Sequence, residues 1–166
     1  MVKFLAVGLT LYVIWFALYE WWIHPMNWVD RVVIDNTLDI SSKILMWMGY
    51  VTESNGARMI RIQGTPGLFM GDGCNGISLF ALFSIFIIAF PGKIIPKIIF
   101  IPAGILLIHC MNILRVVLLA IIETRSYALT EFNHTYTFTI VIYAFIFLLW
   151  LFWINKYSAI RKAPSS

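Results

Sequence analysis

Three residues with reactive or charged side chains lie close to the boundaries of apolar segments. Cys74 stands in the stretch GDGCNGISLF, just before an apolar run that lasts until Pro91. Arg115 stands in HCMNILRVVLL, inside a second apolar run, and His134 stands in EFNHTYTF at the start of a third. Ionisable residues within membrane spans are rare and costly, so each of these residues is a candidate for function.

The segments that carry these residues are apolar enough to cross a membrane. Hydrophobic residues make up 61% of the 166-residue chain and charged residues only 12%, whereas soluble domains are about half apolar and a quarter charged. Open sheets cannot cross hydrocarbon, so we expect an all-α integral membrane protein. Since a spanning helix needs roughly 20 apolar residues, the pattern predicts a four-transmembrane-helix bundle with spans at 4–23, 75–91, 98–122 and 135–154.

Residues 24–74, between the first two spans, form the only sizeable region expected outside the membrane. Residues 28–48 are predicted to form an outer amphipathic helix whose apolar face holds Val29, Val32, Val33, Ile40, Ile44, Trp47 and Met48. Residues 58–70 alternate in polarity and turn at GTPG, which predicts a short β-hairpin. With a cytoplasmic tail at 155–166, the chain is expected to be a single membrane domain over residues 1–166.

The charges predict the orientation in the membrane. Lys3, the turn GKIIPK and the tail carry basic residues and no acid, while all eight acidic residues fall at or beyond the opposite boundary. Because basic residues favour the cytoplasmic side, both termini are expected in the cytoplasm. The basic excess is thereby assigned to membrane topology, and no concentrated basic face indicates nucleic-acid binding.

Alternating helix directions should bring the three candidates to one side of the membrane. The outer ends are the start of the second span, the end of the third and the start of the fourth, so Cys74, Arg115 and His134 are expected to converge on one outward-facing pocket. A cysteine at a helix N-terminus gains thiolate character from the helix dipole, and nearby cations add to it. Asn112 lies three residues before Arg115 on nearly the same helical face and is a supporting candidate.

Each candidate also has a purely structural interpretation. Arg115 could snorkel to the lipid headgroups, Cys74 could be a small packing residue, and His134 could be an incidental interfacial side chain. His24 and His109 are weaker candidates, and the three histidines lack the close spacing of a zinc site. We therefore expect no metal and no organic cofactor.

The combination of motifs resembles a known family. GDGCNGISLF, NILRVVLL and the later His134 are similar to the exosortase and archaeosortase family of membrane cysteine transpeptidases, over roughly residues 70–140. That family shows a Cys-x-Gly motif, an Asn-x-x-Arg motif and a downstream His. The resemblance implies Cys74 as nucleophile, with Arg115 and His134 completing a triad. Asn75 stands where many members have Ser, and the short chain resembles the minimal core of larger members.

The resemblance also implies a function. Members cleave C-terminal sorting signals of secreted, membrane-anchored proteins at the outer membrane-water boundary, through a thioester intermediate. The implied partners are protein substrates that carry a short motif, a transmembrane helix and a basic tail. The implied location is the cytoplasmic (inner) membrane of a prokaryote, with the active site facing the exterior or periplasm. Whether an amine or water accepts the acyl group is left open.

A non-enzymatic function is the alternative. A small transporter subunit or assembly scaffold would use Arg115, Asn112 and His109 to line a polar path or to hold helices together, and it would not need Cys74. The predicted hairpin also has two interpretations. Its strand edge could pair with an extended substrate, or it could serve as a simple lid.

Overall fold

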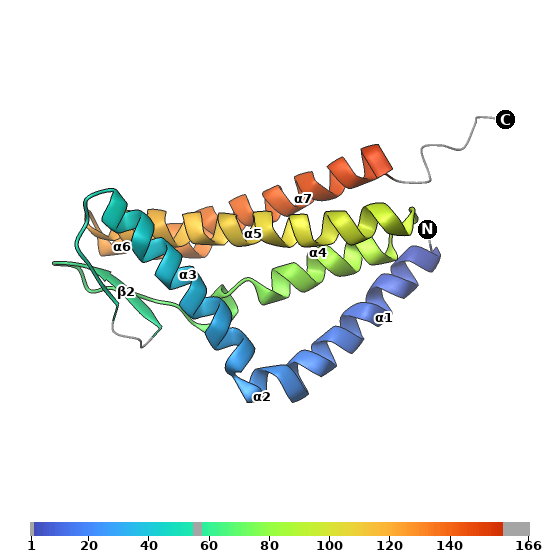
Figure 1. Cartoon of the computed structure of the whole chain (residues 1–166), viewed down its shortest axis with the longest axis horizontal. Coiled ribbons are helices and arrows are strands. Elements are labelled where there is room, and N and C mark those ends of the chain that lie inside the picture. The colour runs from blue at the N-terminus through green and yellow to red at the C-terminus, as the bar shows by residue number, and fades with distance from the viewer. Residues whose placement is uncertain (1, 55–57, 158–166) are drawn as a thin grey trace.

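The computed structural model describes residues 2–54 and 58–157, and this part of the chain is predominantly helical. Long helices lie lengthwise beside one another, while α3 and a small sheet gather at the end away from the start of α1 (Figure 1). The helical elements are α1 (Val2–Leu18), η1 (Tyr19–Ile23), α2 (His24–Met26), α3 (Trp28–Trp47), η2 (Asp72–Cys74), α4 (Ile77–Ala89), α5 (Ile94–Glu123), α6 (Tyr127–Phe132), η3 (Asn133–Thr137) and α7 (Phe138–Tyr157).

Among the described residues, three segments are long and apolar enough to cross a membrane by themselves. They are Phe4–Met26, Ile94–Glu123 and Tyr127–Tyr157. The predicted span at 75–91 is instead the 13-residue helix α4, about 20 Å long at 1.5 Å per residue, where the hydrocarbon core is about 30 Å thick. A left-handed Gly76 precedes α4 and an extended Phe90 ends it, so the predicted count of four full spans is not confirmed.

The predicted amphipathic helix is present as α3, which packs against α5 and the sheet. The residues of α3 that are buried are Asp30, Ile34, Thr37, Leu38, Ser41, Ser42 and Leu45. In contrast, Val32 is 57% exposed and Trp47 is 89% exposed. Small and polar side chains allow α3 to pack closely. Of the predicted apolar face, Ile40 and Ile44 pack partly against the core, whereas Val32 and Trp47 are exposed.

The predicted hairpin is part of a three-stranded antiparallel sheet. The strands are β1 (Thr52–Ser54), β2 (Met59–Ile62) and β3 (Leu68–Phe69), in the order β1-β2-β3. Thr52 pairs with Ile62, and Met59 pairs with Phe69. The turn between β2 and β3 contains Gly64 and Gly67 at φ 89° and 97°, as the GTPG pattern predicts; β1 was not predicted.

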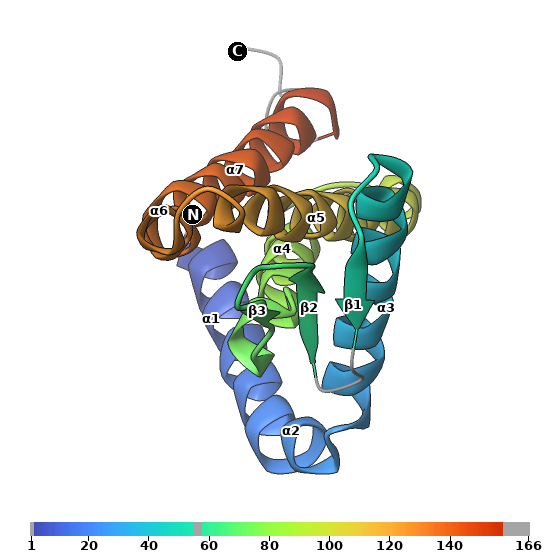
Figure 2. The same cartoon turned by 90° about the vertical axis from the view of Figure 1, so that its left-hand side faces the viewer.

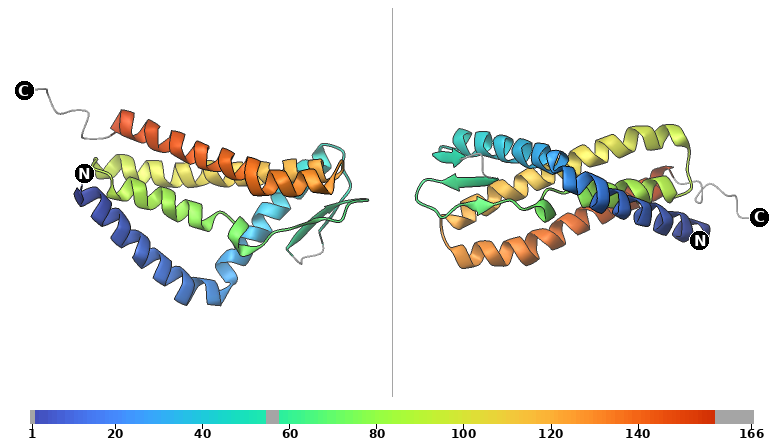
Figure 3. Two further views of the ribbon diagram at one scale, coloured as in Figure 1. Left: turned by 180° about the vertical axis from the view of Figure 1, so that it is seen from behind. Right: turned by 90° about the horizontal axis from the view of Figure 1, so that it is seen from below.

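Two apolar cores hold the described residues together. The first lies under the sheet and contains Leu38 of α3, Ile60 of β2 and Val117 of α5. The second joins α4, α5 and α7 through side chains such as Phe83 and Trp153. Views down and across the long axis show the sheet beside α3 and α5 at one end of the long helices (Figures 2 and 3).

Helix α1 approaches α4 only at one end. A Cβ built on Gly8 would contact the Ala89 Cβ at 3.8 Å, and from there the two helices diverge toward α2 (Figures 1 and 3). The start of α1, the turn between α4 and α5 and the end of α7 all lie at this end of the molecule. Residues 158–166, most of the predicted tail, lie outside the described residues.

Candidate active site

Cys74 lies in a tight loop that the sequence fixes with glycine. The loop makes one 3₁₀ turn, Asp72–Cys74, in which the Cys74 N–H donates to the Gly71 carbonyl at 2.9 Å. Gly76 then takes φ 84° and leads into α4. A side chain at that φ is strained, which gives the glycine of the Cys-x-Gly motif a backbone reason. Cys74 therefore sits just before the N-terminus of α4.

Arg115 and His134 both face the Cys74 sulfur. The distance from Sγ to His134 Nε2 is 3.4 Å, and the distance from Sγ to Arg115 Nη2 is 4.0 Å. The three residues come from the loop before α4, from α5 and from η3, and each is partly buried. The convergence that the helix directions predict is present in the structure.

His134 is placed by a feature that the sequence did not predict. Residue 135 was expected to start the fourth span, with His134 at its outer boundary, but the helical segment begins earlier, at Tyr127. His134 lies within the π-helical turn η3, between α6 and α7. Such wide turns are rare and occur often at functional sites. Here the turn sets the direction of the imidazole.

Asn112 contacts the loop rather than Arg115. Its Nδ2 donates a hydrogen bond to the Cys74 carbonyl at 3.1 Å, and the residue is only 1% exposed. The sequence suggested Asn112 as a supporting residue, and its contact is with the backbone of the candidate nucleophile. His109, by contrast, pairs through Nε2 with Asn36 Oδ1 at 3.0 Å, away from the Cys74 cluster.

The charge at the site is a lone cation. Within residues 2–54 and 58–157, no carboxylate oxygen comes within 4.0 Å of the Arg115 guanidinium nitrogens. The guanidinium is therefore available to a sulfur anion or to an oxyanion in the cavity. No cluster of three or more His, Cys, Asp or Glu residues suited to a metal ion occurs in the described part of the chain.

Two cavities meet at Cys74, Arg115 and His134, which line both of them. A small cavity of about 40 Å³ lies toward the sheet, where β3 and Met70 line it. A larger cavity of about 350 Å³ lies between α4 and α7. The sulfur thus borders a cavity between α4 and α7 and a cavity beside the sheet.

The larger cavity continues as a groove along α4. A second hollow, lined in part by α1, shares Ser78, Leu79 and Tyr143 with the larger cavity. A third hollow shares Tyr12 and Leu82 with the second and extends to Trp150. We call this the α1–α7 groove. It is mostly apolar, runs between α1 and α7 over α4, and opens at Cys74.

The family assignment agrees with this geometry. The family model described as transmembrane exosortase matches residues 3–152. The chain belongs to the transmembrane exosortase family. No curated protein and no solved structure matches it. This exosortase is accordingly a multi-pass membrane protein, and the family match extends well beyond the residues 70–140 that carried the resemblance.

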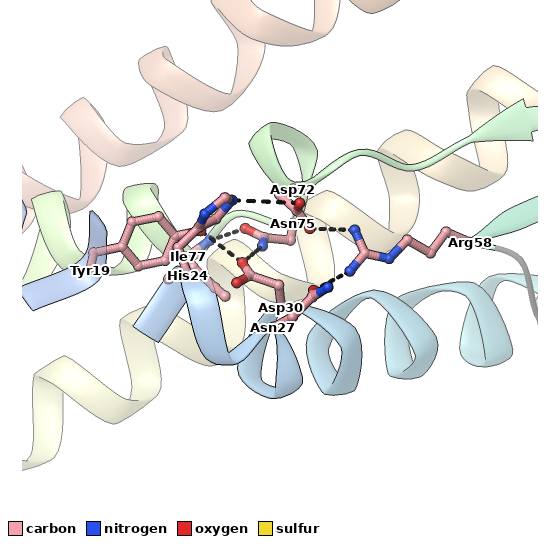
Figure 4. Close-up of polar contacts among 8 residues, drawn as sticks. All are labelled: Tyr19, His24, Asn27, Asp30, Arg58, Asp72, Asn75 and Ile77. Carbon is pink, nitrogen blue, oxygen red and sulfur yellow. Dashed lines mark hydrogen bonds and ion pairs between the residues drawn. The ribbon is translucent and has the colours of Figure 1, made fainter. Parts of the chain in front are cut away.

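The sequence did not reveal a second set of polar residues, which surrounds the loop that carries Cys74. Tyr19, Asp30 and Asn75, the residue that follows Cys74, form a buried hydrogen-bonded chain (Figure 4). Their sequence signal is weak, because Asp30 stands among polar residues expected on the outer side of α3. The only hint is its spacing of four and seven residues from Ile34 and Thr37, which belong to the buried face.

Proposed function

We propose that this exosortase is a membrane-embedded cysteine protease or transpeptidase that cleaves C-terminal sorting signals of secreted, membrane-anchored proteins. The observation that supports this most is the placement of Arg115 and His134 within 4.0 Å of the Cys74 sulfur. A nucleophile, a proton carrier and a fixed cation at one cavity are the groups that acyl transfer requires.

The reaction begins with attack of the Cys74 sulfur on the scissile carbonyl carbon. His134 accepts the thiol proton and donates it to the leaving amine as the C–N bond breaks, which leaves an acyl thioester on Cys74. Arg115 stabilises the oxyanion of the tetrahedral intermediate, a contribution of about 3–4 kcal/mol where single donors have been removed. An amine or water then attacks the thioester while His134 removes its proton, and the C–S bond breaks to release the product and regenerate the Cys74 thiol.

The α1–α7 groove is the proposed site for the substrate's transmembrane helix. A helix lying there would run beside α4 and end at Cys74, because the groove opens at this residue. The motif residues would continue into the smaller cavity under β3. In this arrangement the hairpin borders the extended part of the substrate, either as a lid or as a pairing edge.

The same arrangement supports the proposed orientation. The turn with Lys93 and Lys97 lies at the end of the molecule opposite the sheet. With that end in the cytoplasm, Cys74 faces the exterior or periplasm across a prokaryotic inner membrane. The basic tail of a substrate in the groove would then lie on the cytoplasmic side.

A non-enzymatic transporter subunit or scaffold remains the second candidate. It is favoured by Arg115 and Asn112 inside a membrane span, where polar residues can hold helices together. It is weakened by His109, which pairs with Asn36 and does not extend the polar cluster at Cys74.

Replacing Cys74 separates the two functions. We expect Cys74→Ala to leave full-length precursor in cells that express a protein ending in a short motif, a transmembrane helix and a basic tail. The matched control is Cys110→Ala, since Cys110 is the second free cysteine and is exposed on α5. Immunoblots of precursor size provide the measurement. Normal processing by the Cys74→Ala variant would refute the enzyme and favour the scaffold.

A further inference from the structure

A buried carboxylate lies behind the loop that carries Cys74. Asp30, in the first turn of α3, has no exposed surface. Its Oδ1 accepts hydrogen bonds from the Tyr19 hydroxyl at 2.7 Å and from Asn75 Nδ2 at 2.5 Å (Figure 4). Its Oδ2 has no hydrogen-bond partner among the described residues. Burying a carboxylate without full hydrogen bonding is costly. Of its two partners, Asn75 is the one that lies next to Cys74 in the chain.

The side chain of Asn75 connects Asp30 to the backbone at the start of α4. It follows Cys74 directly and is 2% exposed. While its Nδ2 binds Asp30, its Oδ1 accepts the N–H of Ile77 at 2.9 Å. The side chain thereby connects α3 to the first residue of α4 across the left-handed Gly76. Cys74 is held from α3 through its neighbour and from α5 through Asn112, which binds its carbonyl.

A second set of contacts holds the other side of the loop but is more exposed. Asp72 accepts from Arg58 Nη1 at 2.5 Å and lies 3.6 Å from His24 Nε2, while Arg58 Nη2 donates to Asn27 Oδ1 (Figure 4). Ion pairs that water can reach contribute little. The buried contact of Asp30 is therefore the stronger constraint on the loop.

We propose that Asp30 is a positioning residue that acts through Asn75 to hold the Cys74 thiol against Arg115 and His134. This inference rests on the proposed cysteine chemistry. The recorded partners of Asp30 are Tyr19 and Asn75, and Asp30 lines neither cavity at Cys74. Its loss therefore acts on the alignment of the sulfur through Asn75, and reaches the α1–α7 groove only through the hydrogen bond to Tyr19, which lines one of its hollows. A displacement of about 1 Å at a reacting group costs on the order of 100-fold in rate.

The kinetic test compares Asp30→Leu, Asp30→Asn and Thr37→Val. The full chain is reconstituted in nanodiscs with a precursor from the same genome that ends in a motif, a transmembrane helix and a basic tail. We expect Asp30→Leu to lower kcat about 100-fold with KM changed less than about twofold. Asp30→Asn keeps an acceptor oxygen for both donors and should restore most of kcat. Thr37→Val, equally buried two turns along α3, should match the wild type.

A readout independent of activity is hydrogen exchange of the loop amides. In Asp30→Leu, exchange should accelerate in residues 71–77 and stay at wild-type rates in α3 and α5. Acceleration throughout the protein would show a general structural role and overturn the proposal, as would an unchanged kcat or a loss confined to KM. If Cys74→Ala still processes precursor, the proposed function fails, but the exchange pattern still decides whether Asp30 orders the loop.

Two milder variants keep the test decisive if Asp30→Leu does not fold. Asn75→Ala removes the connection to Ile77 and should lower kcat at least tenfold. Tyr19→Phe removes one of two donors to Asp30 and should lower kcat by a smaller factor. Wild-type kcat in both variants would overturn the positioning role.

Discussion

At the scale of single residues, the site separates two tasks on one cysteine. Arg115 and His134 face the Cys74 sulfur, whereas Asn112 binds its carbonyl oxygen. In the proposed mechanism the first pair acts on the reacting atom, and Asn112 keeps the peptide unit that carries it from turning. Because Asn112 is buried, water does not compete for its hydrogen bond to the Cys74 carbonyl, and the bond constrains the loop.

Reversing the donor at Asn112 tests this constraint. Asn112→Asp replaces the N–H that binds the Cys74 carbonyl with an acceptor oxygen, at a cost of about 1–3 kcal/mol for the unsatisfied buried group. We expect precursor cleavage to slow about 10- to 100-fold, measured as the rate of mature product formation. Asn36→Asp is the matched control, since Asn36 is exposed and uses its Oδ1, which Asp retains, toward His109. Equal rates for the Asn112 and Asn36 variants would contradict the role.

Sequence reasoning reaches the reactive residues more easily than the residues that hold them. Cys74, Arg115 and His134 stand out because a thiol or charge near an apolar span needs an explanation. Asp30 does not stand out, because an acid in an amphipathic helix is normally solvated. Only the packing of α3 against α5 and the loop reveals that this acid faces inward.

At the scale of elements, apolarity locates helices in a membrane protein but does not orient them. The spans at 4–23, 98–122 and 135–154 correspond to the segments Phe4–Met26, Ile94–Glu123 and Tyr127–Tyr157. The apolar pattern of α3 did not indicate which side faces the protein, because lipid removes the usual reason for large apolar residues to turn inward. The predicted span 75–91 was longer than α4. Hydropathy counts residues 75, 76 and 91 with the apolar run, but they lie outside the helix, which extends from Ile77 to Ala89.

Helix spacing can be tested at Gly104 of α5. A Cβ at this position would lie 2.2 Å from the Phe83 ring of α4, and Phe83 is fully buried. Gly104→Ala should force the ring or the helix to move and cost about 1–3 kcal/mol of overpacking strain. We expect a lower thermal midpoint in detergent.

The matched control for Gly104→Ala is Gly8→Ala. Its new Cβ would make an ordinary 3.8 Å contact with Ala89, and alanine favours a helix over glycine. Its midpoint should be unchanged or higher. A Gly104→Ala protein as stable as the Gly8→Ala protein would show that α4 and α5 are not held at this spacing.

At the scale of the whole molecule, the short α4 creates the access route. Because α1 meets α4 near Gly8 and then diverges from it, the half of α4 that is nearer to Cys74 is left uncovered between α1 and α7. The α1–α7 groove occupies that space and ends at the sulfur. The sheet and α3 close the opposite side, so a substrate helix of the proposed kind would reach Cys74 laterally without opening of the bundle.

Filling this groove should affect substrate binding before it affects chemistry. Leu82 lies where two of the hollows meet, so Leu82→Trp should obstruct a helix in the groove while leaving Cys74, Arg115 and His134 in place. We expect KM to rise about tenfold or more with kcat within about twofold, because a mutation that removes uniform binding raises KM alone. Ile99→Trp, at an exposed site of α5 that lines none of these hollows, should leave both constants unchanged. If Leu82→Trp binds precursor as the wild type does, the substrate helix approaches Cys74 by another route, and the α1–α7 groove is not its binding site.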